Sequence, residues 1–341
     1  MTRRVALLAH EGLPDRAKTA VGVLRYADAE VVAVVDREIA EADPDARVTD
    51  YVPEVPDAPI VGRVADAPDF DALVIGVAPI GGGFDESWRP DVRIALEAGA
   101  DVVAGLHYFL ADDEEFAALA AEHGGELRDV RRPPDDLTVA EGRARDLDAE
   151  IVLTVGTDCS TGKMTTTREL YEAARERGVD AAFVPTGQTG IIIEDWGIPI
   201  DRTVSDFTAS AVERMCVERA DHDYLFVEGQ GSLIHPAYSA VTTGLLHGAM
   251  PDSLVMCHDA GREAIHGYES FEIPNPGYVA EMYESLAEPI APTEVVAGAL
   301  NTSGLDGETA TEATKRYRAQ LDAPVADPIR DGAERLLEAV L

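Results

Sequence analysis

The chain has 341 residues, with 64 acidic against 28 basic side chains and a formal net charge of −36. Apolar residues make up 46% of it, which is the composition of a folded globular protein and not of a disordered acidic segment. Such an acidic surface disfavours nucleic acids and anionic membranes as partners, because both require a basic face. Acidic, lysine-poor surfaces are typical of proteins that stay soluble in molar salt, where surface repulsion is screened, so we expect a halophilic protein.

No apolar stretch approaches the ~20 residues of a membrane span, and the run at 5–9 is too short for a signal peptide. The three cysteines and eight histidines show no metal-binding spacing, so no metal site is predicted. An odd number of cysteines without a pairing pattern suits a reducing compartment. We therefore expect a cytoplasmic location.

The first half alternates short β-branched runs with amphipathic segments, a pattern typical of a doubly wound parallel sheet. Strands are predicted at 5–9, 31–35, 72–77 and 101–105, and helices at 17–27, 90–98 and 113–123. The run Gly81-Gly82-Gly83 follows the third strand, at the edge where such sheets bind ligands; a flexible loop without a ligand is the alternative. No G-x-G-x-x-G follows the first strand, so a dinucleotide site is not predicted.

Prolines and charged residues between 131 and 145 cannot continue a helix or a central strand. We therefore predict two α/β domains, at 1–135 and 150–341, both doubly wound and the second with a mostly parallel sheet. In the second domain, strands are predicted at 151–155, 181–185, 224–228, 253–257, 295–300 and 323–325, and helices at 164–176, 208–219, 279–286, 309–320 and 331–340.

A glycine-rich loop lies between the first strand and the first helix of the second domain, and there backbone N–H groups and a helix N-terminus face an anion. The chain has only three lysines, and Lys163 stands in this loop. A flexible ammonium can curl over such a loop and contact a phosphate. The predicted phosphate-binding residues are Gly156, Thr157, Asp158, Cys159, Ser160, Thr161, Gly162, Lys163, Met164 and Thr165.

One position departs from the loops of P-loop NTPases, in which a Ser or Thr hydroxyl after the lysine binds Mg²⁺. Here the residue is Met164, whose thioether is a poor ligand for a hard cation. Thr165 is the next residue, but it is turned by about 100° around the helix. The loop is thus predicted to bind a phosphate, while Mg²⁺-dependent hydrolysis is disfavoured.

Polar side chains after the second strand of this domain suit contact with a substrate. The segment Thr-Gly-Gln-Thr-Gly offers Thr186, Gln188 and Thr189 as hydrogen-bonding groups, and a plain turn is the alternative. Arg202 suits bidentate binding of a substrate carboxylate, and a surface ion pair is its alternative.

Three side chains are candidate general bases. Glu228 ends an apolar strand before Gly-Gln-Gly, where burial and a nearby phosphate favour proton uptake. His235 titrates near neutrality and lies seven residues further on. Asp206 precedes a predicted helix, so it either caps that helix or takes part in catalysis.

The loop has five residues between Gly156 and Gly162, which resembles the dethiobiotin synthetase branch of P-loop proteins. The whole chain is similar to the DUF1611 family, which joins a Rossmann-like N-terminal domain to a deviant P-loop NTPase-like domain. The resemblance is carried by Lys18-Thr19-Ala20, Gly105-Leu106-His107-Tyr108-Phe109-Leu110, Asp129-Val130-Arg131, the Gly-Lys-Met-Thr loop, Thr186-Gly187-Gln188-Thr189-Gly190, Ser205-Asp206-Phe207, Glu228-Gly229-Gln230-Gly231-Ser232-Leu233 and His235-Pro236.

The resemblance implies an N-acetyltransferase of the D-glutamate type, with acetyl-CoA as cofactor and a small acidic amino acid as substrate. The loop is then expected to bind a phosphate of CoA. Two alternatives stay open: an ATP- and Mg²⁺-dependent ligase or kinase like dethiobiotin synthetase, and a non-enzymatic nucleotide-sensing module. Because related P-loop proteins often pair across this domain, we also expect a homo-oligomer.

Overall fold

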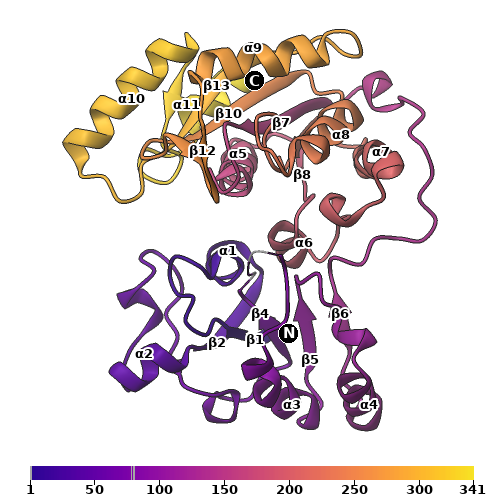
Figure 1. The fold of residues 1–341 in the computed structure, drawn as a ribbon, viewed down its shortest axis with the longest axis vertical. Helices are drawn as coiled ribbons and strands as arrows, with labels where there is room; N and C mark the ends of the chain where they lie inside the picture. The colour runs from indigo at the N-terminus through magenta and orange to yellow at the C-terminus, as the bar shows by residue number, and fades with distance from the viewer. Residues whose placement is uncertain (1, 78, 80) are drawn as a thin grey trace. The chain divides into compact units, whose positions relative to one another are not determined.

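The computed structural model describes residues 2–77, 79 and 81–341, which form two compact units (Figure 1). Unit 1 consists of the described residues up to Pro133 together with 188–202, and unit 2 consists of 134–187 and 203–341. The break at Pro133 lies next to the boundary predicted from the sequence. Residues 188–202, which the sequence pattern places in the second domain, belong instead to unit 1.

Within its described residues, unit 1 contains a parallel six-stranded sheet in the order β3-β2-β1-β4-β5-β6. Its strands are β1 (Arg3–Leu8), β2 (Ala29–Val35), β3 (Ile60–Val61), β4 (Ala72–Ile75), β5 (Asp101–Ala104) and β6 (Leu127–Asp129). Its helices are α1 (Lys18–Tyr26), α2 (Arg37–Ala42), α3 (Arg89–Glu97), α4 (Glu114–His123) and α6 (Gln188–Glu194). Alternate residues such as Leu7 and Leu8 enter two separate apolar cores, as in a sheet covered on both faces. The predicted doubly wound, Rossmann-like architecture is confirmed.

The sheet of unit 2 is also parallel and six-stranded, in the order β14-β13-β10-β7-β9-β8. Its strands are β7 (Glu150–Gly156), β8 (Ala181–Val184), β9 (Tyr224–Val227), β10 (Ser253–Asp259), β13 (Glu294–Asn301) and β14 (Val325–Ala326). Its helices are α5 (Lys163–Glu176), α7 (Thr208–Glu218), α8 (Ser239–Ala249), α9 (Pro276–Ala287), α10 (Gly307–Leu321) and α11 (Glu334–Val340). An antiparallel hairpin, β11 (Ala264–Ile265) with β12 (Tyr268–Glu272), follows β10. The predicted α/β fold with a parallel sheet is confirmed here too.

This topology collects polar groups at one edge of the unit 2 sheet. The glycine-rich loop follows the central strand β7, Glu228 follows the neighbouring β9, and Thr186 follows β8 beyond it. Because all of these strands run parallel, their carboxyl ends meet at the same edge, where open α/β sheets bind ligands.

The helices of both units are short or amphipathic, as expected for elements that cover a sheet. In the described part of the chain, none has the length and apolar character that crossing a bilayer requires.

Candidate functional site

The loop from Thr157 to Gly162 has the backbone shape of an anion cradle. Ser160 (φ 55°) and Gly162 (φ 94°) both adopt left-handed conformations just before α5 begins. Glycine adopts such angles without steric cost, while a serine does so only under local constraint. Left-handed residues in a turn bring neighbouring N–H groups toward one point, and the N-terminus of a fourteen-residue helix adds its dipole. The geometry is that of a phosphate-binding loop.

Lys163 is folded back inside this loop. Its Nζ donates a hydrogen bond to the carbonyl oxygen of Asp158 at 2.7 Å, and its side chain is 6% exposed. A Cβ added to Gly156 would lie 3.1 Å from Nζ, so the lysine passes closely over the end of β7. Burial lowers the pKa of the Lys163 ammonium. Among the described residues, no carboxylate lies within ion-pair distance of Nζ, although the chain carries 64 acidic side chains. A buried cation without a carboxylate partner is a site prepared for an anion.

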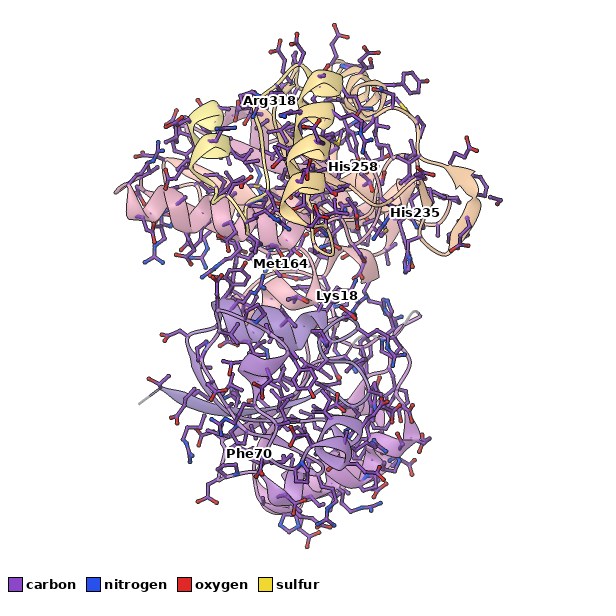
Figure 2. The ribbon with its side chains drawn as sticks, turned by 90° about the vertical axis from the view of Figure 1, so that its left-hand side faces the viewer. Lys18, Phe70, Met164, His235, His258 and Arg318 are labelled. Carbon is purple, nitrogen blue, oxygen red and sulfur yellow. The ribbon has the colours of Figure 1, made fainter. Side chains whose placement is uncertain are left out.

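The residue after the lysine is the second of α5 and offers no oxygen to a metal ion. Met164 is half-buried there, and Figure 2 labels its side chain. Thr165 is half-buried one position further along the helix. The hydroxyl of Thr167, one turn on, donates to the Lys163 carbonyl at 2.8 Å, so it is part of the helix. The structure therefore agrees with the sequence in having no hydroxyl group at the position that binds Mg²⁺ in P-loop NTPases.

Two predicted loop residues direct their side chains toward the protein and not toward a ligand. The hydroxyl of Thr157 shares a hydrogen bond of 2.8 Å with Nδ1 of His258, an imidazole whose pKa burial lowers to about 4. The fully buried carboxylate of Asp158 accepts N–H groups from Cys159 at 2.7 Å and from His266 at 2.8 Å. These side chains fix the loop, while its backbone is left to hold the anion.

Arg262 completes the surroundings of Asp158 and was not recognised from the sequence. Its guanidinium donates to Asp158 Oδ2 at 3.0 Å, to the Cys159 carbonyl at 2.6 Å and to Asp259 at 3.1 Å. Asp158 and Arg262 are 104 residues apart, so no local sequence pattern predicts their contact. The contacts tie the loop to the start of the β11–β12 hairpin.

Glu228 holds the turn after β8. Its Oε2 accepts the backbone N–H groups of Thr186 at 3.0 Å and of Gly187 at 3.1 Å, and its Oε1 accepts the Gln230 amide at 3.1 Å. The Thr186 hydroxyl donates to the Glu228 carbonyl at 2.6 Å. Because a Cβ on Gly229 would lie 1.8 Å from the Thr154 carbonyl and 3.0 Å from Lys163 Cδ, glycine alone fits beside the lysine. The predicted residues Thr186 and Glu228 thus lie together, next to the loop.

His235 is 2% exposed and has a defined proton position. The backbone N–H of Ala237 donates to its Nδ1 at 3.1 Å, so in the neutral ring the proton is on Nε2. Burial lowers the pKa of the imidazole, which keeps the ring neutral near pH 7. Its Nε2 lies 3.9 Å from Asp158 Oδ1. His235 is therefore arranged as a hydrogen-bond donor, which disagrees with the general-base role predicted for it.

Asp158, Cys159 and His235 each offer one ligand atom, and these atoms lie within 4.8 Å of one another. With Nδ1 occupied by a backbone N–H and Nε2 protonated, the group lacks the free imidazole nitrogen that a metal site needs.

Three other predicted residues, Gln188, Thr189 and Arg202, belong to unit 1. Gln188 Oε1 accepts a hydrogen bond from Arg131 at 2.8 Å, and the Thr189 hydroxyl bonds to that of Thr19 at 2.9 Å. The Arg202 guanidinium lies 4.9 Å from the centroid of the Phe109 ring. The segment that reads as one motif in the sequence is thus divided, with Thr186 in unit 2 and Gln188 and Thr189 in unit 1.

Asp206 is exposed, and the predicted helix cap is not formed. The residue before α7 is Phe207, and no side chain caps that helix terminus. The cap is missing because a 3-10 turn over Ser205–Phe207 leads directly into the helix, so its N–H groups are met by backbone carbonyls.

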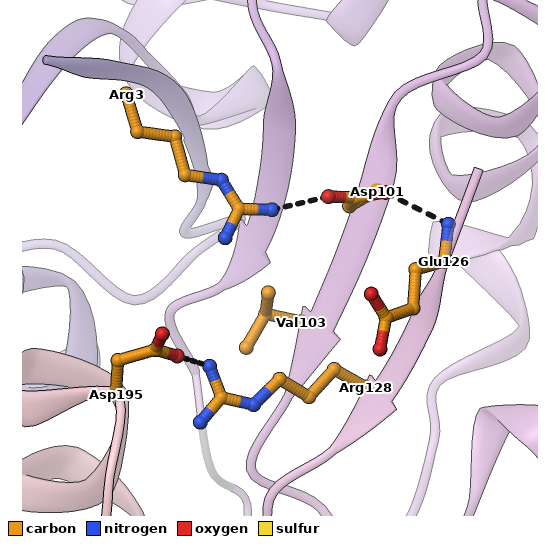
Figure 3. A pocket seen from close by; sticks show the side chains of 6 residues that line it. All are labelled: Arg3, Asp101, Val103, Glu126, Arg128 and Asp195. Carbon is orange, nitrogen blue, oxygen red and sulfur yellow. Dashed lines mark hydrogen bonds and ion pairs between the residues drawn. The ribbon is translucent and has the colours of Figure 1, made fainter. Parts of the chain in front are cut away.

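A cavity of about 240 Å³ in unit 1 lies elsewhere, near the starts of β1 and β5 (Figure 3). Arg3 is paired with Asp101 there, and Arg128 is paired with Asp195. Because both guanidinium groups already have carboxylate partners, this cavity offers little to an anionic ligand.

The fold and this site define the class of protein: a Rossmann-like unit joined to a P-loop unit with a methionine in place of the magnesium-binding hydroxyl residue. The chain belongs to the DUF1611 family. A model of the family's P-loop domain, described as a domain of unknown function, matches residues 138–337, and a model of its Rossmann-like domain matches 41–133.

The chain is also similar to two named proteins and to one protein of known structure. A D-glutamate N-acetyltransferase of Tritonibacter scottomollicae is 37% identical, over 81% of this chain and 83% of its own. A protein of the same name from a Pseudoalteromonas species is 36% identical, over 78% of this chain and 80% of its own. The crystal structure of a DUF1611 family protein from Anabaena variabilis has 40% identity and a TM-score of 0.93, with 99% of both chains covered.

Proposed function

We propose that this protein transfers an acetyl group from acetyl-CoA to the amino group of D-glutamate or a similar small acidic amino acid. One observation of the structure carries the proposal: a buried lysine that no described carboxylate pairs with, inside a phosphate cradle whose usual magnesium-binding position is Met164. CoA carries phosphates that need anchoring but no metal-assisted cleavage. The two relatives named D-glutamate N-acetyltransferase, at 36–37% identity, support the same reaction.

Different residues of unit 2 bind the cofactor and hold the loop in shape. Lys163 and the loop amides hold a phosphate of CoA, and charge-assisted hydrogen bonds of this kind are the strong ones. Nε2–H of His235, beside the loop, donates to an oxygen of the bound cofactor. The role of Asp158 and Arg262 is to keep the loop in shape.

The chemical step needs a proton acceptor, since the attacking amine must be neutral. The amine nitrogen attacks the thioester carbonyl carbon, the new N–C bond forms, the C–S bond breaks, and the CoA thiolate leaves and is protonated. The carboxylate of Glu228, which follows β9 beside the loop, takes the proton from nitrogen, since a carboxylate at this edge of the sheet is a suitable general base.

Ligand binding distinguishes this proposal from the ATP-dependent alternative. We expect acetyl-CoA and CoA to raise the thermal midpoint of the protein more than ATP with Mg²⁺, measured by differential scanning fluorimetry. A ligand at one hundred times its dissociation constant adds about 2.7 kcal/mol of stability, so the preferred cofactor should be plain. Stabilisation by ATP with Mg²⁺ alone, and no release of CoA thiol in the presence of D-glutamate, would reject acetyl transfer.

A substitution at the departing position tests the metal independently. Met164→Thr restores the hydroxyl of metal-dependent loops, yet acetyl transfer should stay within a few-fold of the original rate because phosphate anchoring needs no metal ligand there. The measurement is the initial rate of thiol release with and without EDTA. Loss of activity in EDTA that Mg²⁺ restores would favour the ATP-dependent reading.

A further inference from the structure

A network of buried and half-buried polar side chains in unit 1 has no role in the chemistry above. It lies at the carboxyl ends of β5 and β6, which is the edge of an open α/β sheet that binds ligands. Arg131 is its centre and is 8% exposed. The guanidinium donates to the Gly105 carbonyl at 2.7 Å, to His107 Nε2 at 2.7 Å and to Gln188 Oε1 at 2.8 Å, and it forms an ion pair with Asp201.

The network leaves two buried polar atoms without partners. Because Arg131 donates to Nε2 of His107, the proton of the neutral ring is on Nδ1, and this buried N–H meets no acceptor among the described residues. Burial and the charge of Arg131 both lower the pKa of His107, so the ring is neutral near pH 7. The buried Oδ1 of Asp201 likewise meets no donor within the described part of the structure. Buried polar atoms without partners are rare in native proteins, and such an atom calls for a water molecule or a ligand.

A positive charge accompanies these two atoms. Arg202 follows Asp201 directly, and its charge, like that of Asp201, acts on His107. Both Arg202 and Arg132 lie over the Phe109 ring, at 4.9 and 4.1 Å from its centroid. Arg132 is paired with Asp112, whereas Arg202 has no carboxylate within ion-pair distance among the described residues. In so acidic a chain, Arg202 is a cation available to an external anion.

The loop Gly81-Gly82-Gly83, which the sequence predicts to contact a ligand, lies against His107. The His107 backbone N–H donates to the Gly82 carbonyl at 2.8 Å, and a Cβ added to Gly82 would lie 2.4 Å from His107 Cδ2. Gly82 also has a φ of 62°, which a side chain rarely adopts. The loop therefore closes on the imidazole only because it carries a glycine.

We propose that His107, Asp201 and Arg202 form a binding site, within unit 1, for an amino acid that carries a side-chain carboxylate. An unpaired acceptor, an unpaired donor and an unpaired cation are the complement of an amino acid with a side-chain carboxylate. Asp201 Oδ1 accepts a hydrogen bond from the amino group, while the His107 Nδ1–H and the Arg202 guanidinium hold carboxylate oxygens. Arg131 and Gln188 are positioning residues, since their hydrogen bonds hold His107 and Asp201. This assignment rests on the proposed acetyl transfer for the identity of its ligand.

Binding of two acids that differ only in the amino group tests the assignment. The dissociation constants of D-glutamate and glutarate are measured by isothermal titration calorimetry, with and without CoA. Arg202→Gln is expected to weaken both acids by about 10- to 100-fold, the effect of losing charge-assisted hydrogen bonds. Asp201→Asn should weaken D-glutamate by about tenfold or more while glutarate changes little, because only the amino group contacts Oδ1.

Arg175→Gln is the matched control, since Arg175 also lies over an aromatic ring, Tyr171, and its side chain is 56% exposed. It should bind both acids like the unsubstituted protein. Thermal midpoints report whether Asp201→Asn disturbs the fold, and the exposed Arg202 keeps the test informative if it does.

Unchanged affinity of Arg202→Gln for both acids, or equal loss of both acids in Asp201→Asn, would overturn the site and leave water molecules as the partners of the buried atoms. The proposed function fails separately: in that case the unsubstituted protein releases no CoA thiol with D-glutamate, whatever the variants bind.

Discussion

Replacing Lys163 by alanine is expected to weaken the binding of CoA by about two orders of magnitude, since hydrogen bonds to charged groups contribute ~1.5–3 kcal/mol and each 1.4 kcal/mol is a factor of ten. The reason is local. Nζ is the buried cation of the loop, its shortest hydrogen bond is to the Asp158 carbonyl, and a phosphate supplies the anion that no described residue provides. Titration calorimetry with CoA measures the change.

The control is Lys315→Ala, because Lys315 is exposed on α10 and pairs with Glu312 of the same helix. It should bind CoA like the unsubstituted chain. Lys163→Arg should not restore binding, since a planar guanidinium is too bulky for a path on which Nζ lies 3.1 Å from a Cβ placed on Gly156. A Lys163→Ala protein with unchanged thermal midpoint and unchanged affinity for CoA would rule out the phosphate-binding loop.

Local pattern was enough to predict the part of the site that one segment of chain builds. The loop before Lys163 has its strand on one side and its helix on the other, so spacing and glycine content identify it. The same holds for the alternating strands and helices, which predict two parallel sheets. Short or exposed elements carry no such signal: β6 has three residues, and every residue of β12 is exposed. These elements were missed because three residues are too few to show a period, and a strand exposed along its whole length has no apolar alternation.

Contacts between distant segments account for the other differences. Arg131 and Asp201 are 70 residues apart, and they pair because residues 188–202 belong to unit 1. The hydrophobic periodicity of the sequence does not predict that this segment belongs to unit 1. The proton of His235 is likewise fixed by one backbone N–H, that of Ala237. The sequence identifies an imidazole near the loop, but the hydrogen bond decides that it donates. Residue type alone therefore predicts the chemistry available, and tertiary hydrogen bonds decide which part of it is used.

Glu228 has both a structural and a proposed chemical role, since its carboxylate holds a turn and is also the proposed proton acceptor. Oε2 accepts two backbone N–H groups, from Thr186 and Gly187, while Oε1 faces the Gln230 amide. Glutamine can place its carbonyl oxygen where Oε2 lies and keep both backbone hydrogen bonds. Its NH₂ then lies where Oε1 was, and Gln230 can turn its own amide to accept from it. Glu228→Gln thus removes the base and preserves the turn, whereas Glu228→Ala removes both.

We therefore expect Glu228→Gln to lower kcat for acetyl transfer by roughly 10²–10⁴, the usual contribution of a general base, with the affinity for CoA almost unchanged. Glu228→Ala should lower kcat at least as far and also weaken CoA, because the Thr186–Gly187 turn loses the two hydrogen bonds that fix it beside the loop. Steady-state rates together with calorimetric binding separate the two effects. If Glu228→Gln keeps its rate within a few-fold while Glu228→Ala loses it, then Glu228 only positions the turn. The proton acceptor would then be sought elsewhere, beginning with the exposed carboxylate of Asp206, which Asp206→Asn tests by the same two measurements.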